Sequence, residues 1–88
     1  MDNTYIALKK ILNMMVPEKY PMVSRIQVID DSNEYNNGIN YLIYLGVIPE
    51  ELERLRSSDV RDYIEEVSRY VLKGDETLRV VFFNPDLF

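Results

Sequence analysis

The sequence predicts an α+β domain in which a small, mixed three-stranded sheet packs with two main helices, in the order α-β-β-(short α)-α-β. The central observation is the run from Ile39 to Ile48, which is apolar or aromatic apart from one asparagine and one glycine. β-Branched and aromatic residues in such a run favour a strand. Residues 5–16 and 57–73 repeat apolar side chains at helical spacing, and residues 23–30 and 77–83 alternate as half-exposed strands do.

The length of the chain corresponds to one domain. It has 88 residues, of which 47% are hydrophobic, and this is enough to build a packed core. We expect residues 1–83 to form a single α+β domain and residues 84–88 to form an extended C-terminal tail.

The composition argues against several classes of function. The chain contains no cysteine and no histidine, so it lacks the commonest general base and the commonest transition-metal ligands. The formal charge of −5 disfavours nucleic-acid binding, which needs clustered lysine and arginine. A glycine-rich phosphate loop and a nucleophile elbow are both missing from the sequence. We therefore predict that the protein is not an enzyme, takes no cofactor or metal and binds no small-molecule substrate.

The first helix is expected from about Tyr5 to Val16, with Asn3 or Thr4 as its cap and Pro17 as its end. At helical spacing, six apolar side chains share its buried face: Tyr5, Leu8, Ile11, Leu12, Met15 and Val16.

Residues 23–30 and Ile39–Ile48 are expected to pair as an antiparallel hairpin, because Asn37-Gly38 is a strong turn signal. The nearly continuous apolar character of the second strand predicts that it is central and covered on both faces. The same pattern would suit helices on only one face, which would leave the other sheet face for a partner. The sequence leaves this choice open.

A short helix is expected to begin at Pro49 and to end near Arg56, followed by the second main helix from Ser57 or Ser58 to the residue before Gly74. The apolar stripe of the second main helix consists of Val60, Tyr63, Ile64, Val67 and Val71. The last strand, 77–83, has one face formed by Leu78, Val80 and Phe82, and another formed by Thr77, Arg79, Val81 and Phe83. The second main helix links the central strand to this last one, and such a crossover would be right-handed if the two strands are parallel neighbours; the sequence leaves the strand order open.

Two acidic features resemble functional sites. Residues 30–34 have the oxygen density of a calcium loop, but they lack the glycine and the closing glutamate of an EF-hand, so a solvated turn is favoured. The glutamates near Glu50 and Glu65 lie in surface patterns of helices, whereas catalytic carboxylates need a pocket that shifts their pKa.

Four apolar residues are candidates for contacts with a partner protein. Ile6 and Met14 fall outside the buried face of the first helix. Leu87 and Phe88 end the chain after Pro85, which directs the tail away from the sheet. We predict that these four residues bind a protein partner or a second copy of the chain.

The end of the tail, Asp86-Leu87-Phe88, resembles the end of the bacterial sliding-clamp-binding peptide, whose pattern is glutamine, leucine, serine or aspartate, leucine, phenylalanine. The resemblance covers three of the five positions. Asn84 and Pro85 depart from the pattern, and Asn84 stands where the family has its anchoring glutamine.

Protein–protein interaction is the function class that remains. The sequence predicts a non-enzymatic structural or assembly protein, for example a phage or virion component; small phage tail-completion and connector proteins are similar mixtures of two helices and a short sheet. The alternative is a small acidic inhibitor or adaptor that binds a basic protein surface, as nucleic-acid mimics do. No signal peptide or membrane-length apolar run is evident, so we expect a cytoplasmic protein, located in the host cytoplasm or the virion if it is phage-encoded.

Overall fold

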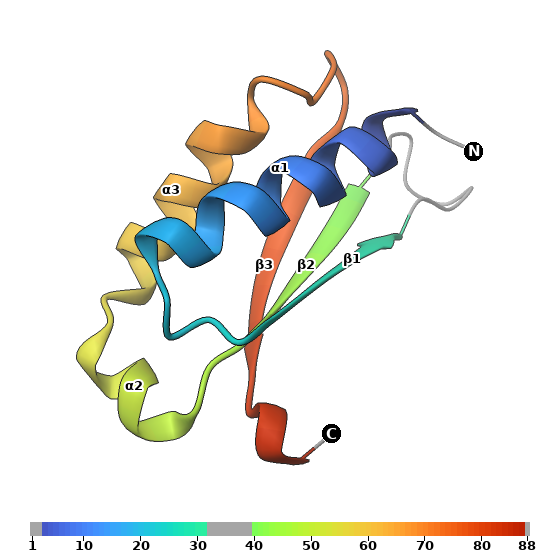
Figure 1. Cartoon of the computed structure of the whole chain (residues 1–88). Coiled ribbons are helices and arrows are strands. Elements are labelled where there is room, and N and C mark those ends of the chain that lie inside the picture. Colours follow the sequence, from blue (N-terminus) through green and yellow to red (C-terminus); the bar gives the residue numbers. More distant parts are fainter. Residues whose placement is uncertain (1–2, 32–39, 88) are drawn as a thin grey trace.

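A computed structural model describes residues 3–31 and 40–87 of the chain (Figure 1). The turn predicted at Asn37-Gly38, most of the acidic loop and Phe88 lie outside the described residues. The elements follow one another in the predicted order: α1 (Asn3–Lys19), β1 (Arg25–Asp30), β2 (Asn40–Gly46), α2 (Pro49–Arg54), α3 (Ser57–Ser68), β3 (Thr77–Phe83) and a 3-10 turn, η1 (Pro85–Leu87). The predicted α+β class is therefore confirmed.

The three strands form one mixed sheet in the order β1-β2-β3. β1 is antiparallel to β2, with Val28 opposite Ile43, and β3 is parallel to β2, with Val80 opposite Ile43. The prediction of a mixed three-stranded sheet is confirmed. The parallel pair requires a long connection, which α2 and α3 provide.

The main core lies between the two long helices and one face of the sheet. On the central strand, Tyr41, Ile43 and Leu45 are fully buried, whereas Leu42 and Tyr44 on the other face are only half-buried. The helices complete this core with the side chains of Leu8, Leu12, Val16, Val60, Ile64 and Val67. α1 packs against both α3 and β1. The expectation that the central strand is covered on both faces is therefore wrong for the described residues, and the alternative with helices on one face holds.

Aromatic contacts join the C-terminal end of α1 to the middle of α3. The rings of Tyr20 and Tyr63 meet edge to face with their centroids 5.7 Å apart, and the Lys19 ammonium lies 4.5 Å from the centre of the Tyr63 ring. The Tyr63 hydroxyl donates a hydrogen bond to the Met15 carbonyl at 3.4 Å. Burial, with smaller contributions from Asp59 and Tyr63, raises the pKa of Tyr20. These contacts fix the angle between the helices beside the sheet.

Pro17 does not end α1, contrary to the prediction, and the helix continues to Lys19. A proline within a helix removes one hydrogen bond, here the bond that residue 17 would donate to the Asn13 carbonyl. The loss is tolerated because Pro17 is exposed and lies in the last turn. The backbone N–H of Tyr20 closes that turn by donating to the Val16 carbonyl at 2.7 Å.

α3 ends at Ser68 and does not reach Gly74, so the predicted end of this helix is also wrong. The N–H groups of Val71 and Leu72 both donate to the Ser68 carbonyl, at 3.0 and 2.9 Å, and turn the chain towards β3. This turn allows Val71 and Leu72 to pack against the core.

The start of the tail differs from the extended conformation that was expected. The side-chain oxygen of Asn84 accepts a hydrogen bond from the N–H of Asp86 at 3.0 Å, and its backbone carbonyl accepts one from the N–H of Leu87 at 3.1 Å. Asparagine commonly forms such local bonds and thereby initiates a turn.

Among the described residues, no helix has the length and apolar character needed to cross a membrane.

Candidate functional site: the uncovered face of the sheet

In the described part of the chain, no α-helix or strand covers the face of the sheet opposite the main helices, and Pro85 of η1 approaches this face at the Gly46 end. Strand alternation and the pairing register place ten side chains on it; we call this set the open sheet face, and its members are Arg25, Gln27, Ile29, Asn40, Leu42, Tyr44, Thr77, Arg79, Val81 and Phe83. Across the strands, Gln27 pairs with Tyr44 and Tyr44 with Val81. The centre of the open sheet face is therefore apolar and aromatic.

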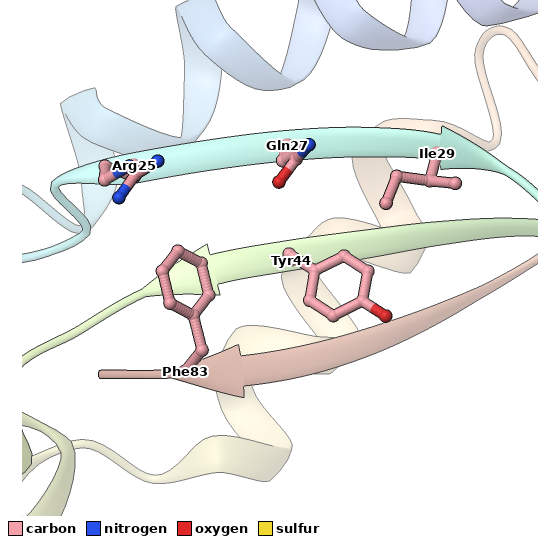
Figure 2. Close-up of a pocket in the computed structure, with 5 residues that line it drawn as sticks. All are labelled: Arg25, Gln27, Ile29, Tyr44 and Phe83. Carbon is pink, nitrogen blue, oxygen red and sulfur yellow. The ribbon is translucent and has the colours of Figure 1, made fainter. Parts of the chain in front are cut away.

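Five residues of this face line an open hollow of about 320 Å³, and Figure 2 views it with the helices behind the sheet. The rings of Tyr44 and Phe83 lie beside each other, with centroids 6.5 Å apart and an angle of 64° between their planes. The guanidinium carbon of Arg25 lies 5.6 Å from the centre of the Phe83 ring. The hollow thus combines two aromatic surfaces with a cation at one end; its remaining lining residues are Gln27 and Ile29.

Gly46 allows the side chains at this end of the sheet to approach β2 closely. A Cβ atom at this position would lie 3.1 Å from both the Arg25 Cβ and the Phe83 Cζ, and 3.3 Å from the Pro85 Cβ. Contacts this short are rare, so any larger residue would displace the Phe83 ring or the start of the tail. The glycine that interrupts the apolar run of β2 is therefore explained by packing on the open sheet face.

The charges on this face differ in sign from the charge of the whole chain. The charged side chains that the three strands place on it are Arg25 and Arg79, although the formal charge of the chain is −5. Exposed carboxylates gather instead along α2 and α3, at Glu50, Glu53, Asp59, Asp62, Glu65 and Glu66. The open sheet face thus has apolar rings, and its charged side chains are all positive. It is complementary to a partner surface that carries apolar side chains beside carboxylates.

The partner-binding residues predicted from the sequence do not lie on the open sheet face. Ile6 and Met14 are on α1, where they are 38% and 65% exposed, and their eight-residue separation corresponds to about 12 Å along the helix axis. Leu87 is 75% exposed in η1, which lies apart from α1 (Figure 1). Phe88 lies outside the described residues. The structure does not bring Ile6, Met14 and Leu87 together into one surface.

The sequence left an uncovered sheet face for a partner as one of two alternatives, but no partner-binding residue was assigned to that face. The alternation in residues 77–83 separates Val81 and Phe83 from Val80 and Phe82, and Tyr41 and Tyr44 fall on opposite faces of the central strand. The missing information was which of these two faces the helices cover. This is decided by the tertiary packing of α1 and α3.

The described residues offer little for metal chemistry. Among residues 3–31 and 40–87, no three acidic side chains are grouped so that they could hold a metal ion. The calcium-like loop extends over residues outside the described part, so its predicted behaviour as a solvated turn stays a prediction.

The chain matches no protein-family model, and comparisons with curated proteins and with solved structures found no match.

Proposed function

We propose that this chain is a non-enzymatic structural or assembly protein that binds a protein partner through the open sheet face. The observation that carries the proposal is the pair Tyr44 and Phe83, two aromatic side chains left half-buried where no described α-helix or strand covers the sheet. Contiguous exposed apolar surface is typical of interaction sites, and tyrosine, phenylalanine and arginine are enriched in the centres of protein interfaces.

The expected partner presents apolar side chains together with carboxylates. An apolar side chain would fill the hollow between Tyr44 and Phe83, whose rings form rigid walls on a sheet. Carboxylates beside it would meet Arg25 and Arg79, and arginine can bind a carboxylate through two parallel hydrogen bonds. A phage or virion component in the host cytoplasm is a narrower form of this proposal and rests on the fold-level similarity alone.

A nucleic acid fits this face less well than a protein. Exposed rings beside arginine can stack on bases, but single-strand binding also needs a positive groove that follows the phosphates. The open sheet face has two arginines, and the chain as a whole is acidic. We therefore propose a protein partner, no nucleic acid and no small-molecule substrate.

The second candidate function, an acidic inhibitor or adaptor, is favoured by a different surface. α3 exposes Asp59, Asp62, Glu65 and Glu66, and these could contact a basic protein surface. Arg61 and Arg69 interrupt this acidic surface. Binding through it would weaken steeply with salt, whereas an apolar contact on the open sheet face would hold.

A selection from a library of randomised displayed peptides tests the proposal without knowledge of the partner. The purified protein is the target, and the Tyr44→Thr/Phe83→Thr variant is used to remove peptides that bind elsewhere. We expect selected peptides to contain an aromatic or aliphatic residue flanked by aspartate or glutamate. Their affinity should fall at least about tenfold for the double variant, because both anchor rings are lost.

Met14→Gln is the matched control, since it removes an exposed apolar side chain from α1 and leaves the sheet intact. Its affinity for the selected peptides should equal that of the wild type. Peptides that are rich in lysine and arginine and bind less well as salt increases would favour the acidic-inhibitor function. Peptides that lose affinity with Met14→Gln but not with the double variant would refute the open sheet face as the site.

A further inference from the structure

We propose that two copies of the chain associate through their β1 strands, which pair antiparallel and join the two three-stranded sheets into one continuous sheet. The contact uses the edge of β1, and it leaves the rings of Tyr44 and Phe83 on the open sheet face uncovered. The inference goes beyond the proposed function, because it concerns the purified chain alone and needs no other partner.

β1 is an outer strand of the sheet. The Asp31 N–H donates to the Asn40 carbonyl of β2 at 2.8 Å. In an antiparallel pair, alternate residues direct their backbone N–H and C=O groups to the same side, so Gln27 and Ile29 also face β2. The N–H and C=O groups of Ile26 and Val28 therefore point away from β2, to the outer side of the sheet. Within residues 3–31 and 40–87, no strand pairs with this outer side. An outer strand with outward N–H and C=O groups is a template for pairing with another chain.

The opposite edge of the sheet is protected. Arg61 of α3 reaches over β3 and donates a hydrogen bond from Nη1 to the Val80 carbonyl, and its guanidinium carbon lies 5.2 Å from the centre of the Phe82 ring. Charged side chains are a common means of blocking an edge strand. In the described part of the chain, no side chain hydrogen-bonds to the outward backbone groups of Ile26 or Val28. The two edges therefore differ, and β1 is the one available for pairing.

The charges on β1 select one register. Two copies related by a twofold axis perpendicular to the sheet keep their helices on the same side, so residues facing each other must both be odd-numbered or both even-numbered. In one such register, Val28 of one copy faces Val28 of the other, so the numbers of any two facing residues add up to 56. In this register, Arg25 of each copy faces Asp31 of the other. Arg25 and Asp31 are both exposed in the single chain.

This register places opposite charges at both ends of the paired strands. Arg25 and Asp31 would occupy positions without hydrogen bonds between their backbones, where facing Cα atoms approach to about 4.5 Å. Opposite charges at facing positions stabilise strand pairs. Between them, Gln27 of each copy faces Ile29 of the other. Moving the axis to Gln27 would place Arg25 opposite Ile29 and remove both charge pairs.

The pairing would give the dimer two open sheet faces on the same side of one sheet. β1 has six residues, so the contact is small compared with a standard protein interface. We therefore expect a concentration-dependent dimer with a dissociation constant in the micromolar range or above.

Charge exchange between Arg25 and Asp31 tests the dimer and its register. Arg25→Glu alone places a glutamate opposite Asp31, and Asp31→Arg alone places two arginines opposite each other, so each variant should dimerise at least about tenfold less tightly than the wild type. The Arg25→Glu/Asp31→Arg double variant should recover the dimer. An equal mixture of the two single variants should form a mixed dimer, because at one end of the paired strands the introduced glutamate faces the introduced arginine, and at the other end Asp31 of one copy faces Arg25 of the other.

Sedimentation velocity over a range of concentrations measures the dimer of the wild type, the single variants and the double variant, and circular dichroism confirms that every variant is folded. Arg79→Glu is the matched control: it makes the same charge change on the open sheet face but lies on β3, so it should leave the dimer unchanged. A wild type that stays monomeric into the millimolar range would overturn the proposal. Single variants that dimerise like the wild type, or a double variant that does not recover the dimer, would overturn it as well.

Discussion

We expect Val67→Asp to lower the free energy of unfolding by about 3–5 kcal/mol, enough to unfold most of the protein at room temperature. Val67 is 4% exposed on α3 and belongs to the core between the helices and the sheet. An aspartate at this position would carry an unpaired charge in an apolar environment, and small domains have little stability to spare. Urea and thermal unfolding followed by circular dichroism measure the change.

Tyr70→Asp is the control for this experiment. It introduces the same carboxylate three residues further along the chain, where Tyr70 is 82% exposed. We expect it to change the free energy of unfolding by less than about 1 kcal/mol. If both variants unfolded at the same urea concentration, the assignment of the buried side of α3 would be incorrect.

The second large effect distinguishes the two faces of the central strand. Tyr41 is fully buried under the helices, and its hydroxyl donates to the Glu76 carboxylate at 3.4 Å. Tyr41→Ala should therefore lower the free energy of unfolding by about 3–5 kcal/mol, because it removes a ring from the core and leaves a cavity. Tyr41→Phe keeps the ring and should change it by less than about 1.5 kcal/mol.

Tyr44→Ala makes the same change three residues further along β2, on the open sheet face. We expect a loss of only about 1–2 kcal/mol, since this ring is already partly in water. The same variant should weaken the binding of the selected peptides. Equal losses of stability for Tyr41→Ala and Tyr44→Ala would mean that both faces of the sheet are buried, contrary to the structure described here.

Most of the fold could be predicted from local patterns. The apolar stripes of α1 and α3 follow the helical period, and Leu8, Leu12, Ile64 and Val67 are buried as that period requires. The central strand was evident from its apolar run. The helical connection between β2 and β3 suits their parallel pairing, although the order of the strands was left open.

The ends of the helices were harder to predict because single residues favour an end only weakly. Pro17 lies in the last turn of α1, where the loss of one hydrogen bond does not stop the helix. Gly74 suits a helix end, but the chain turns earlier, at Ser68, which brings Val71 and Leu72 onto the core. At the end of α3, packing of Val71 and Leu72 therefore prevailed over the local preference of Gly74.

The candidate site depended on information that no local pattern contains. Alternation shows that Val81 and Phe83 share a face with Tyr44 once the register is known, but it does not show on which face the helices pack. An apolar run such as that of β2 is expected both for a strand buried on two faces and for one whose second face binds a partner. The exposure of Ile6 and Met14 followed from the helical period. Their predicted role in binding is an alternative to the open sheet face, and the last experiment below separates the two.

Site-specific photo-crosslinking in the source cell tests most directly whether the open sheet face is the binding surface. A benzophenone amino acid is placed at position 44 in one variant and at position 14 in another, so that each reports on proteins within reach of one surface. We predict a crosslinked protein of defined mass from position 44, lost when Phe83→Thr is added, and no such product from position 14. A product from position 14 with none from position 44 would contradict the proposed function and favour the exposed side of α1.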